Sequence, residues 1–216
     1  SFGVFDRPLD AKKFVRDRGG AWAVKADGLA AGKGVLICPD PASAEAAIAE
    51  IMEDRAFGEA GARCVVEEFL TGEEASLLAF VDGKEAVLMP SAQDHKPIGE
   101  GDTGPNTGGM GAYSPAPIMS AEIEARALNE VIRPAVEEMA RRGTPYRGIL
   151  YAGLMIEEGS FKVLEFNCRF GDPECQPLLM RMESDLLPVL LACAEGDLSK
   201  AEVSFSDDPA ACAAAL

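Results

Sequence analysis

Short apolar runs and a helical repeat of apolar residues alternate along the first seventy residues. Between positions 41 and 55, apolar side chains recur at 44, 47, 48, 51 and 52, the spacing of one helix face. A shorter helix is predicted over 10–18, with Asp10 as its cap. Three apolar runs have the length of strands, residues 21–25, 34–38 and 63–70. The pattern predicts a small α+β lobe at 1–70.

The rest of the chain mixes the same two patterns on a larger scale. A hairpin is predicted about the Asp82-Gly83 turn, and a long amphipathic helix over 120–142 with Ser120 as its cap. Two further strands are predicted at 148–157 and 161–167. Two helices are predicted at 173–182 and 185–195, and Ser184 is expected to cap the second. We expect a larger lobe at 71–198. Residues 199–216 form a tail without a clear pattern.

Periodicity disappears between Pro90 and Pro117. A loop of this length inside a compact domain is usually functional or disordered. Its glycines at 101, 104, 108, 109 and 111 stand among Asp, Asn, Thr and Tyr, unlike a low-complexity linker. We favour an active-site loop over a linker, because ordered long loops commonly carry function.

Composition narrows the possible partners and the compartment. The formal net charge of −16 argues against a nucleic-acid partner and requires local basic groups, backbone amides or metal to hold an anion. Six widely spaced cysteines and a single histidine favour reduced thiols in the cytoplasm over a zinc site. No membrane-spanning run or signal peptide is visible, so no membrane partner is expected. The chain opens at Ser1 and stops inside an apolar run, which predicts a piece of something longer.

The predicted strand at 161–167 carries the clearest candidate chemistry. Alternation places Phe161, Val163, Glu165 and Asn167 on one face. A carboxylate and an amide oxygen two residues apart suit Mg²⁺, which usually takes one or two carboxylates plus phosphate oxygens. Arg169 follows with the same parity and would add a cation for a bound anion. The alternative is a strand end with solvated polar residues.

A loop of small residues, DGLAAGK at 27–33, joins two predicted strands. It resembles a Walker A loop, but its glycines are one residue too close and no Ser or Thr follows Lys33. Such a loop can still approach a polyphosphate, because small side chains leave its backbone amides uncovered. A flexible hairpin loop with Lys25 and Lys33 in solvent is the alternative.

The segment EEFLTGEE at 67–74 combines an apolar strand end, a tight turn and several carboxylates. A purine needs a backbone donor and acceptor, and its ribose hydroxyls need a carboxylate. This segment can supply all three. An ordinary acidic turn is the alternative in a chain this acidic.

Four stretches together resemble one family in order and spacing. They are KADGLAAGKGV (25–35), EEFLTGEEAS (67–76), QDHK…GDTGPNTGGMGAYSP (93–115) and LEFNCRFGDPE (164–174). The chain resembles the glycinamide ribonucleotide synthetases, or phosphoribosylamine–glycine ligases, over about residues 20–198. The resemblance implies an α+β ATP-grasp fold, with two lobes of mainly antiparallel sheets that close on ATP.

The resemblance also assigns nucleotide contacts. Lys25 would bind the α- and β-phosphates, and the Gly28–Gly34 loop would close over them. Glu67 would accept from the adenine amino group, and Glu74 would hold the ribose. The implied ATP-binding residues are Lys25, Gly28, Gly32, Lys33, Gly34, Glu67, Glu68, Phe69, Leu70 and Glu74.

Metal and substrate roles follow in the same way. Glu165 and Asn167 would bind Mg²⁺ or Mn²⁺, and Arg169 would neutralise the transferring phosphoryl group. Lys96 and Asp172 complete the implied catalytic set. Glycine and 5-phosphoribosylamine would face a set of residues from 94 to 110, namely Asp94, His95, Asp102, Asn106, Thr107, Gly108, Gly109 and Met110.

The implied reaction is an ATP-dependent ligation in purine biosynthesis. ATP activates glycine as glycyl phosphate, and the amine of 5-phosphoribosylamine displaces phosphate. Two departures from the family stand out. Ala152 occupies the position that we match to a third acidic metal ligand, and the N- and C-terminal domains of the family are missing. The alternatives are another acyl-phosphate-forming ATP-grasp ligase and a nucleotide-binding module without chemistry of its own.

Overall fold

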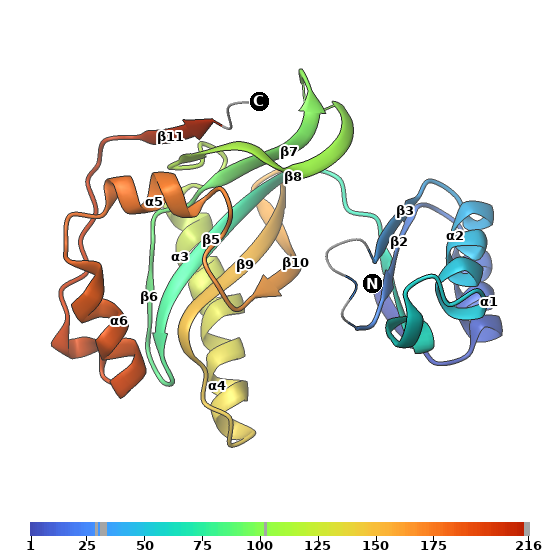
Figure 1. Cartoon of the computed structure of the whole chain (residues 1–216), viewed down its shortest axis with the longest axis horizontal. Helices are drawn as coiled ribbons and strands as arrows, with labels where there is room; N and C mark the ends of the chain where they lie inside the picture. Colours follow the sequence, from blue (N-terminus) through green and yellow to red (C-terminus); the bar gives the residue numbers. More distant parts are fainter. Residues whose placement is uncertain (29, 31–33, 102, 214–216) are drawn as a thin grey trace. The chain divides into compact units, whose positions relative to one another are not determined.

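The computed structural model describes residues 1–28, 30, 34–101 and 103–213, without the side chains of residues 97, 105 and 106. The chain divides into two compact units, Ser1–Leu70 and Thr71–Leu216. Figure 1 labels their helices and strands. Each unit is described by itself below.

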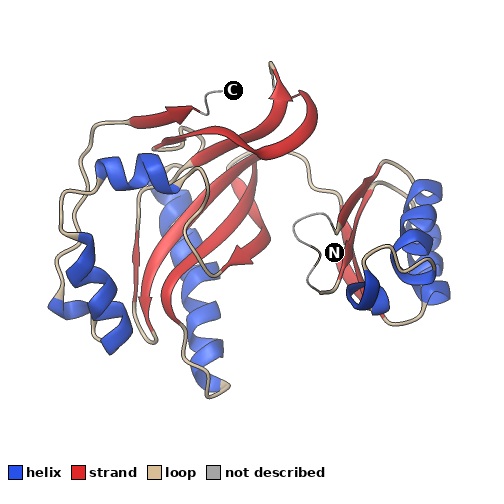
Figure 2. Cartoon of the chain, in the orientation of Figure 1, coloured by secondary structure: helices blue, strands red, loops and turns tan. Residues whose placement is uncertain are grey.

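The first unit is a four-stranded antiparallel sheet with helices on one face (Figure 2). Its strand order is β1 (Phe2–Phe5), β4 (Cys64–Glu68), β2 (Trp22–Ala26) and β3 (Val35–Cys38). Its main helices are α1 (Pro8–Arg18) and α2 (Pro41–Ile48), and α2 continues into a π-helical turn, Ala49–Glu53. A short 3-10 helix, Gly58–Ala62, precedes β4.

Alternation along these strands separates a core face from an open face. Val24 and Val66 are fully buried beneath α1 and α2, together with Val15, Ile48 and Ile51.

The predicted start of the first helix at Asp10 is wrong. The helix begins two residues earlier at Pro8, a residue that suits the first helical turn, and no side chain caps it. Strand β1 was not predicted.

The second unit contains two sheets. The larger has the order β10 (Ser160–Asn167), β9 (Arg147–Glu157), β5 (Glu73–Asp82) and β6 (Ala86–Leu88). The smaller has the order β11 (Ala210–Ala213), β8 (Thr103–Ser114) and β7 (Gln93–Gly99). All pairs are antiparallel, and a bridge between Ser76 and Ala92 connects β5 to the segment that enters β7.

Helices pack on both faces of the larger sheet. On one face, α3 (Ala121–Ala127), a π-helical turn (Leu128–Ile132) and α4 (Arg133–Arg141) form the long helix that periodicity predicted, with Ser120 as its cap. On the other face lie α5 (Cys175–Arg181) and α6 (Leu186–Glu195), followed by a 3-10 turn, Leu198–Lys200. The cap of α6 is Asp185, whose carboxylate accepts from Leu187, and not Ser184 as predicted.

The prediction of one long loop between Pro90 and Pro117 is wrong as to secondary structure. Most of this segment is a hairpin of β7 and β8, whose register shifts between His95 and Pro97 and again before Gly99. The glycines and prolines that erase the hydrophobic period also cause this irregular pairing. The tail likewise adopts structure, because Ala210–Ala213 pair with β8.

Candidate functional site

In the first unit, a charged pair lies on the open face of the sheet. The Lys25 ammonium is 2.6 Å from a carboxylate oxygen of Glu67 on the neighbouring strand, and both side chains are partly buried. The cross-strand register places four exposed apolar side chains on the same face, those of Phe2, Val4, Val35 and Ile37. An apolar surface with a cation and a carboxylate at its centre can bind a flat ring and an anionic group.

Some polar groups at the end of β4 and just after it already have partners within the first unit. The Glu68 carboxylate pairs with the Ser1 ammonium at 2.6 Å. The Phe69 N–H donates to the Ala21 carbonyl at 3.1 Å, so this N–H is not free to act as the predicted donor to a purine ring. The Phe69 side chain itself is exposed.

Of the small-residue loop at 27–33, the structure describes residues 27, 28 and 30. Gly32 and Lys33 lie outside the described residues. A Cβ on Gly28 would lie 2.8 Å from the Ala60 backbone, and one on Gly34 would lie 2.6 Å from the Ala30 Cβ. Both positions therefore need glycine for close packing.

In the second unit, Glu165 and Asn167 point to the same side of β10. The Asn167 amide donates to a Glu165 oxygen at 2.9 Å. A bulge at Leu164 interrupts the register, so Val163 pairs with Leu154 and Glu165 with Gly153. The placement of Phe161 and Val163 on this face is wrong, because the extra residue in a bulge shifts the alternation. Both residues face α3 and α4.

The residue opposite Glu165 is Gly153, which corrects the match to Ala152. Ala152 pairs with Phe166, is fully buried and faces the helices. A Cβ on Gly153 would lie 3.3 Å from the Glu165 Cγ, so glycine at this position permits the close approach of the Glu165 side chain. One carboxylate and one amide oxygen on the same side of a strand fit Mg²⁺, which keeps several water or phosphate ligands.

Arg169 and Asp172, which follow β10, have their hydrogen bonds with neighbouring residues of the chain. The Arg169 guanidinium donates to the Phe170 carbonyl at 2.7 Å and is exposed. Asp172 accepts from the Gln176 amide at 3.4 Å. Within the described part of the chain, neither Arg169 nor Asp172 forms a hydrogen bond or ion pair with Glu165 or Asn167.

Strand β7 brings a second charged cluster to this unit. The Lys96 ammonium lies 3.4 Å from Asp94 and 3.5 Å from Glu74. Burial raises the pKa of the Asp94 carboxyl, although Lys96 acts in the opposite direction. Burial alone would lower the pKa of Lys96, but Asp94 and Glu74 outweigh it and raise that pKa. Asp94 is 5% exposed, so this charge is held in a poorly solvated place.

The hairpin of β7 and β8 supports this cluster through its backbone. The Thr107 hydroxyl donates to the Lys96 carbonyl at 2.8 Å and accepts from the Gly109 N–H at 3.0 Å. A Cβ on Gly109 would lie 2.6 Å from Pro173, so the glycine permits close approach to the segment after β10.

The remaining predicted substrate residues are distributed along the same hairpin. The His95 ring lies 5.5 Å from the Tyr113 ring. Gly108 and Met110 lie in β8, as does the backbone of Asn106, whose side chain is outside the described set. Asp102 lies outside the described residues.

Three buried residues form a polar network that the sequence analysis missed. The Tyr151 hydroxyl lies 2.8 Å from the Ser76 hydroxyl, and both donate to Glu174 at 2.9 Å. Burial, and then the Glu174 carboxylate, raises the pKa of Tyr151. The available signal was a serine and a tyrosine within otherwise apolar strands, on the face that carries Glu165 and Asn167.

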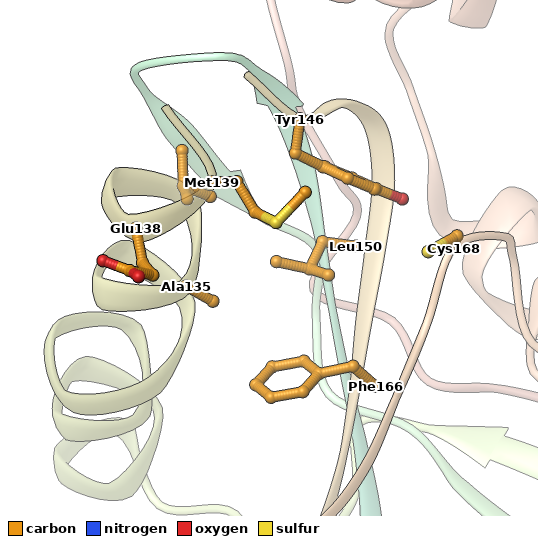
Figure 3. A pocket seen from close by; sticks show the side chains of 8 residues that line it. Ala135, Glu138, Met139, Tyr146, Leu150, Phe166 and Cys168 are labelled. Carbon is orange, nitrogen blue, oxygen red and sulfur yellow. The ribbon is translucent and has the colours of Figure 1, made fainter. Parts of the chain in front are cut away.

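An apolar cavity of about 280 Å³ lies on the other side of β10, between the sheet and α4 (Figure 3). Phe166 and Leu150 enter it from the sheet and Met139 from the helix. Because Phe166 faces away from Glu165, this cavity is separate from the polar cluster.

Solved structures first define the class of protein. The phosphoribosylamine–glycine ligase of Thermotoga maritima matches 98% of this chain and 53% of its own, with a TM-score of 0.87 and 31% identity. The biotin carboxylase domain of Hydrogenobacter thermophilus 2-oxoglutarate carboxylase, in complex with MgADP, has a TM-score of 0.71 at 13% identity over 97% of this chain and 44% of its own. The chain has an ATP-grasp fold, as the sequence resemblance implied.

The particular family follows from the sequence. Residues 1–175 match the family model of the phosphoribosylglycinamide synthetase ATP-grasp (A) domain, and the chain belongs to this family. Phosphoribosylamine–glycine ligases of Allochromatium vinosum and Vibrio vulnificus are 54% and 55% identical to it over 211 and 202 residues. They match 97% and 93% of this chain, which spans 49% and 47% of their lengths.

Proposed function

We propose that this chain supplies the ATP- and metal-binding part of a phosphoribosylamine–glycine ligase. That enzyme joins glycine to 5-phosphoribosylamine and yields glycinamide ribonucleotide, ADP and phosphate. The observation that carries the proposal is the pairing of Glu165 with Asn167 in the same unit as the Asp94–Lys96–Glu74 cluster. The names of the similar proteins support it.

Each unit contributes different groups to this reaction. On the first unit, Lys25 binds phosphate and the surrounding apolar face accepts the adenine ring. On the second, Glu165 and Asn167 hold Mg²⁺ or Mn²⁺, which when bound neutralises phosphate oxygens. Lys96 and Arg169 add positive charge near the reacting carboxylate and phosphoryl group. We assign no nucleophilic side chain, because the substrate amine performs the displacement.

The proposed compartment is the cytoplasm. The six cysteines are free thiols, which suits a reducing environment. None of the helices in the described residues has the length and apolar character of a membrane span.

The test is ADP release by the complete enzyme with glycine and phosphoribosylamine supplied together or singly. We expect release only with both, and equal release with either one omitted would contradict the proposal. Glu165→Ala should lower turnover by at least about a hundredfold, because a lost metal ligand removes charge stabilisation of the transition state. Glu137→Gln, an exposed change on α4, is the control and should leave turnover unchanged.

A further inference from the structure

The apolar cavity between β10 and α4 has no part in the proposed reaction, because it lies on the opposite side of β10 from Glu165 and Asn167. Its volume is about 280 Å³. An apolar cavity of roughly 150 Å³ is large enough to bind benzene. The space beside β10 can therefore hold a molecule of about two fused rings.

Two polar groups at the edge of the cavity already have partners within the protein. The Glu138 carboxylate pairs with Arg141 at 2.6 Å and with Arg142 at 2.7 Å. In Figure 3 this carboxylate points away from the cavity. The Tyr146 hydroxyl donates to the Ile149 carbonyl. A charged ligand would lose its hydration without gaining a partner from these groups, so the lining favours an uncharged molecule.

The side chains that enter the cavity favour an aromatic ligand. The rings of Phe166 and Tyr146 and the thioether of Met139 line it (Figure 3). Aromatic rings attract one another in offset or tilted arrangements, and a thioether sulfur attracts the edge of a ring. A flat, neutral molecule of two rings therefore matches the cavity in size, charge and lining.

Strand β10 connects this cavity to the metal pair on its other face. Phe166 stands between Glu165 and Asn167 in the sequence, and its side chain enters the cavity while theirs point to the polar face. Among the described strands, β10 pairs only with β9, and the Phe166 side chain is 46% exposed. A ligand packed against Phe166 supplies contacts that the empty space lacks and restricts this edge strand. Metal binding then has less ordering left to perform.

We propose that this cavity binds a neutral two-ring aromatic molecule, and that its occupation favours metal binding at Glu165 and Asn167. The binding site stands independently of the proposed function, whereas the coupling to metal rests on it. Because coupling between two sites is reciprocal, metal at the pair raises the affinity of the cavity for its ligand by the same factor.

The binding test uses naphthalene as the probe and 2-naphthoate, which adds a carboxylate to the same rings, as the comparison. Equilibrium dialysis measures both affinities in wild type, Ala135→Leu and Ala140→Leu. Ala135 lines the cavity, whereas Ala140 is exposed on the same helix, so only the first variant fills the cavity.

We expect wild type and Ala140→Leu to bind naphthalene equally, and about tenfold or more tightly than 2-naphthoate. In Ala135→Leu, naphthalene affinity should fall about tenfold or more, because the added side chain takes up the ligand's space. Equal naphthalene affinity in a folded Ala135→Leu and in wild type, or no preference of wild type for naphthalene, would overturn the site. Should Ala135→Leu not fold, the preference of wild type decides.

The coupling test repeats the naphthalene measurement in ADP with Mg²⁺ or with a chelator. Mg²⁺ should raise naphthalene affinity about fivefold in wild type. Glu165→Ala should keep the affinity and lose the increase. Mg²⁺ that binds wild type in calorimetry and leaves naphthalene affinity unchanged would overturn the coupling. Failure of the proposed metal site is distinguishable, because it appears as an increase that Glu165→Ala retains or as no Mg²⁺ binding at all, and Ala135→Leu still decides the cavity.

Discussion

At the scale of single residues, buried carboxylates have two different kinds of surroundings. Asp82, 5% exposed, accepts backbone N–H donors from Lys84, Glu85 and Leu198 at 2.8–2.9 Å. Asp94 has an oxygen without a hydrogen bond. The first arrangement joins the β5–β6 turn to the 3-10 turn that follows α6, whereas the second leaves a buried oxygen without a donor.

Asp82→Ala should therefore lower the free energy of unfolding by about 2–3 kcal/mol, because it leaves buried N–H groups unpaired. The measurement is urea denaturation followed by the tyrosine signal. Asp207→Ala, at an exposed position, is the control and should change the value by less than about 0.5 kcal/mol. An equal effect of both variants would contradict the structural role of Asp82.

The Asp82 carboxyl also makes the free energy of unfolding depend on pH. Burial alone would raise the pKa of Asp82, but the three backbone donors outweigh it and lower that pKa. A carboxyl with a lowered folded-state pKa adds stability that is present above its unfolded pKa of about 3.9. This contribution disappears as pH falls through the lower folded value. Asp82→Asn should lose less stability than wild type between about pH 4 and pH 2.

At the scale of elements, irregularities in the strands place the polar groups. The bulge at Leu164 turns Glu165 and Asn167 toward the polar face while Phe161 and Phe166 stay on the apolar side. The register shifts of β7 and β8 lie on either side of Pro97, next to Lys96, and Gly109 of β8 approaches Pro173. In a strand with strict alternation, Phe161 would lie on the same face as Glu165 and Asn167.

Two neighbouring glycines in β8 test this element. Gly109 has a φ of +128° and no room for a Cβ beside Pro173, so Gly109→Ala should destabilise the second unit by about 2 kcal/mol. Gly108 has nothing within 4 Å of a built Cβ, and Gly108→Ala is the matched control with an effect below about 0.5 kcal/mol.

The aromatic residues allow the two units to be followed separately in this experiment. All three tyrosines lie in the second unit, and the single tryptophan, Trp22, lies in the first. Gly109→Ala should shift the tyrosine transition and leave the Trp22 transition in place. A shift of the Trp22 transition alone would show that the strain at Gly109 is not the cause.

At the scale of the whole molecule, charge opposes the proposed ligand. A net charge of −16 repels ATP, so binding depends on metal and on local cations. Added salt screens this long-range repulsion, with a Debye length of about 10 Å at 0.1 M. Added salt weakens direct ion pairs between ATP and the protein less than it weakens the long-range repulsion.

We therefore expect ATP affinity without Mg²⁺ to rise as NaCl increases from 10 to about 100 mM, and affinity with Mg²⁺ to be higher at every salt concentration. Calorimetric titration with ATP, with and without a chelator, measures both. In Glu165→Ala the gain from Mg²⁺ should shrink, whereas Glu137→Gln should keep it. An undiminished gain in Glu165→Ala would remove that residue from the metal site.

The sequence by itself determined the elements whose signals are local. The long helix after Ser120, the hairpin about Asp82-Gly83, and the adjacency of Glu165 and Asn167 follow from side-chain periods and turn chemistry over a few residues. The ATP-grasp class followed from short motifs in fixed order.

Only the tertiary structure decided which distant groups meet. The network of Ser76, Tyr151 and Glu174 joins residues 75 and 98 positions apart, and no local period encodes such a contact. The bulge at Leu164 and the β7–β8 hairpin depend on pairing with neighbouring strands, which supplies the hydrogen bonds that a weak local pattern does not specify. The burial of the Asp94 carboxylate became visible only once those strands were placed.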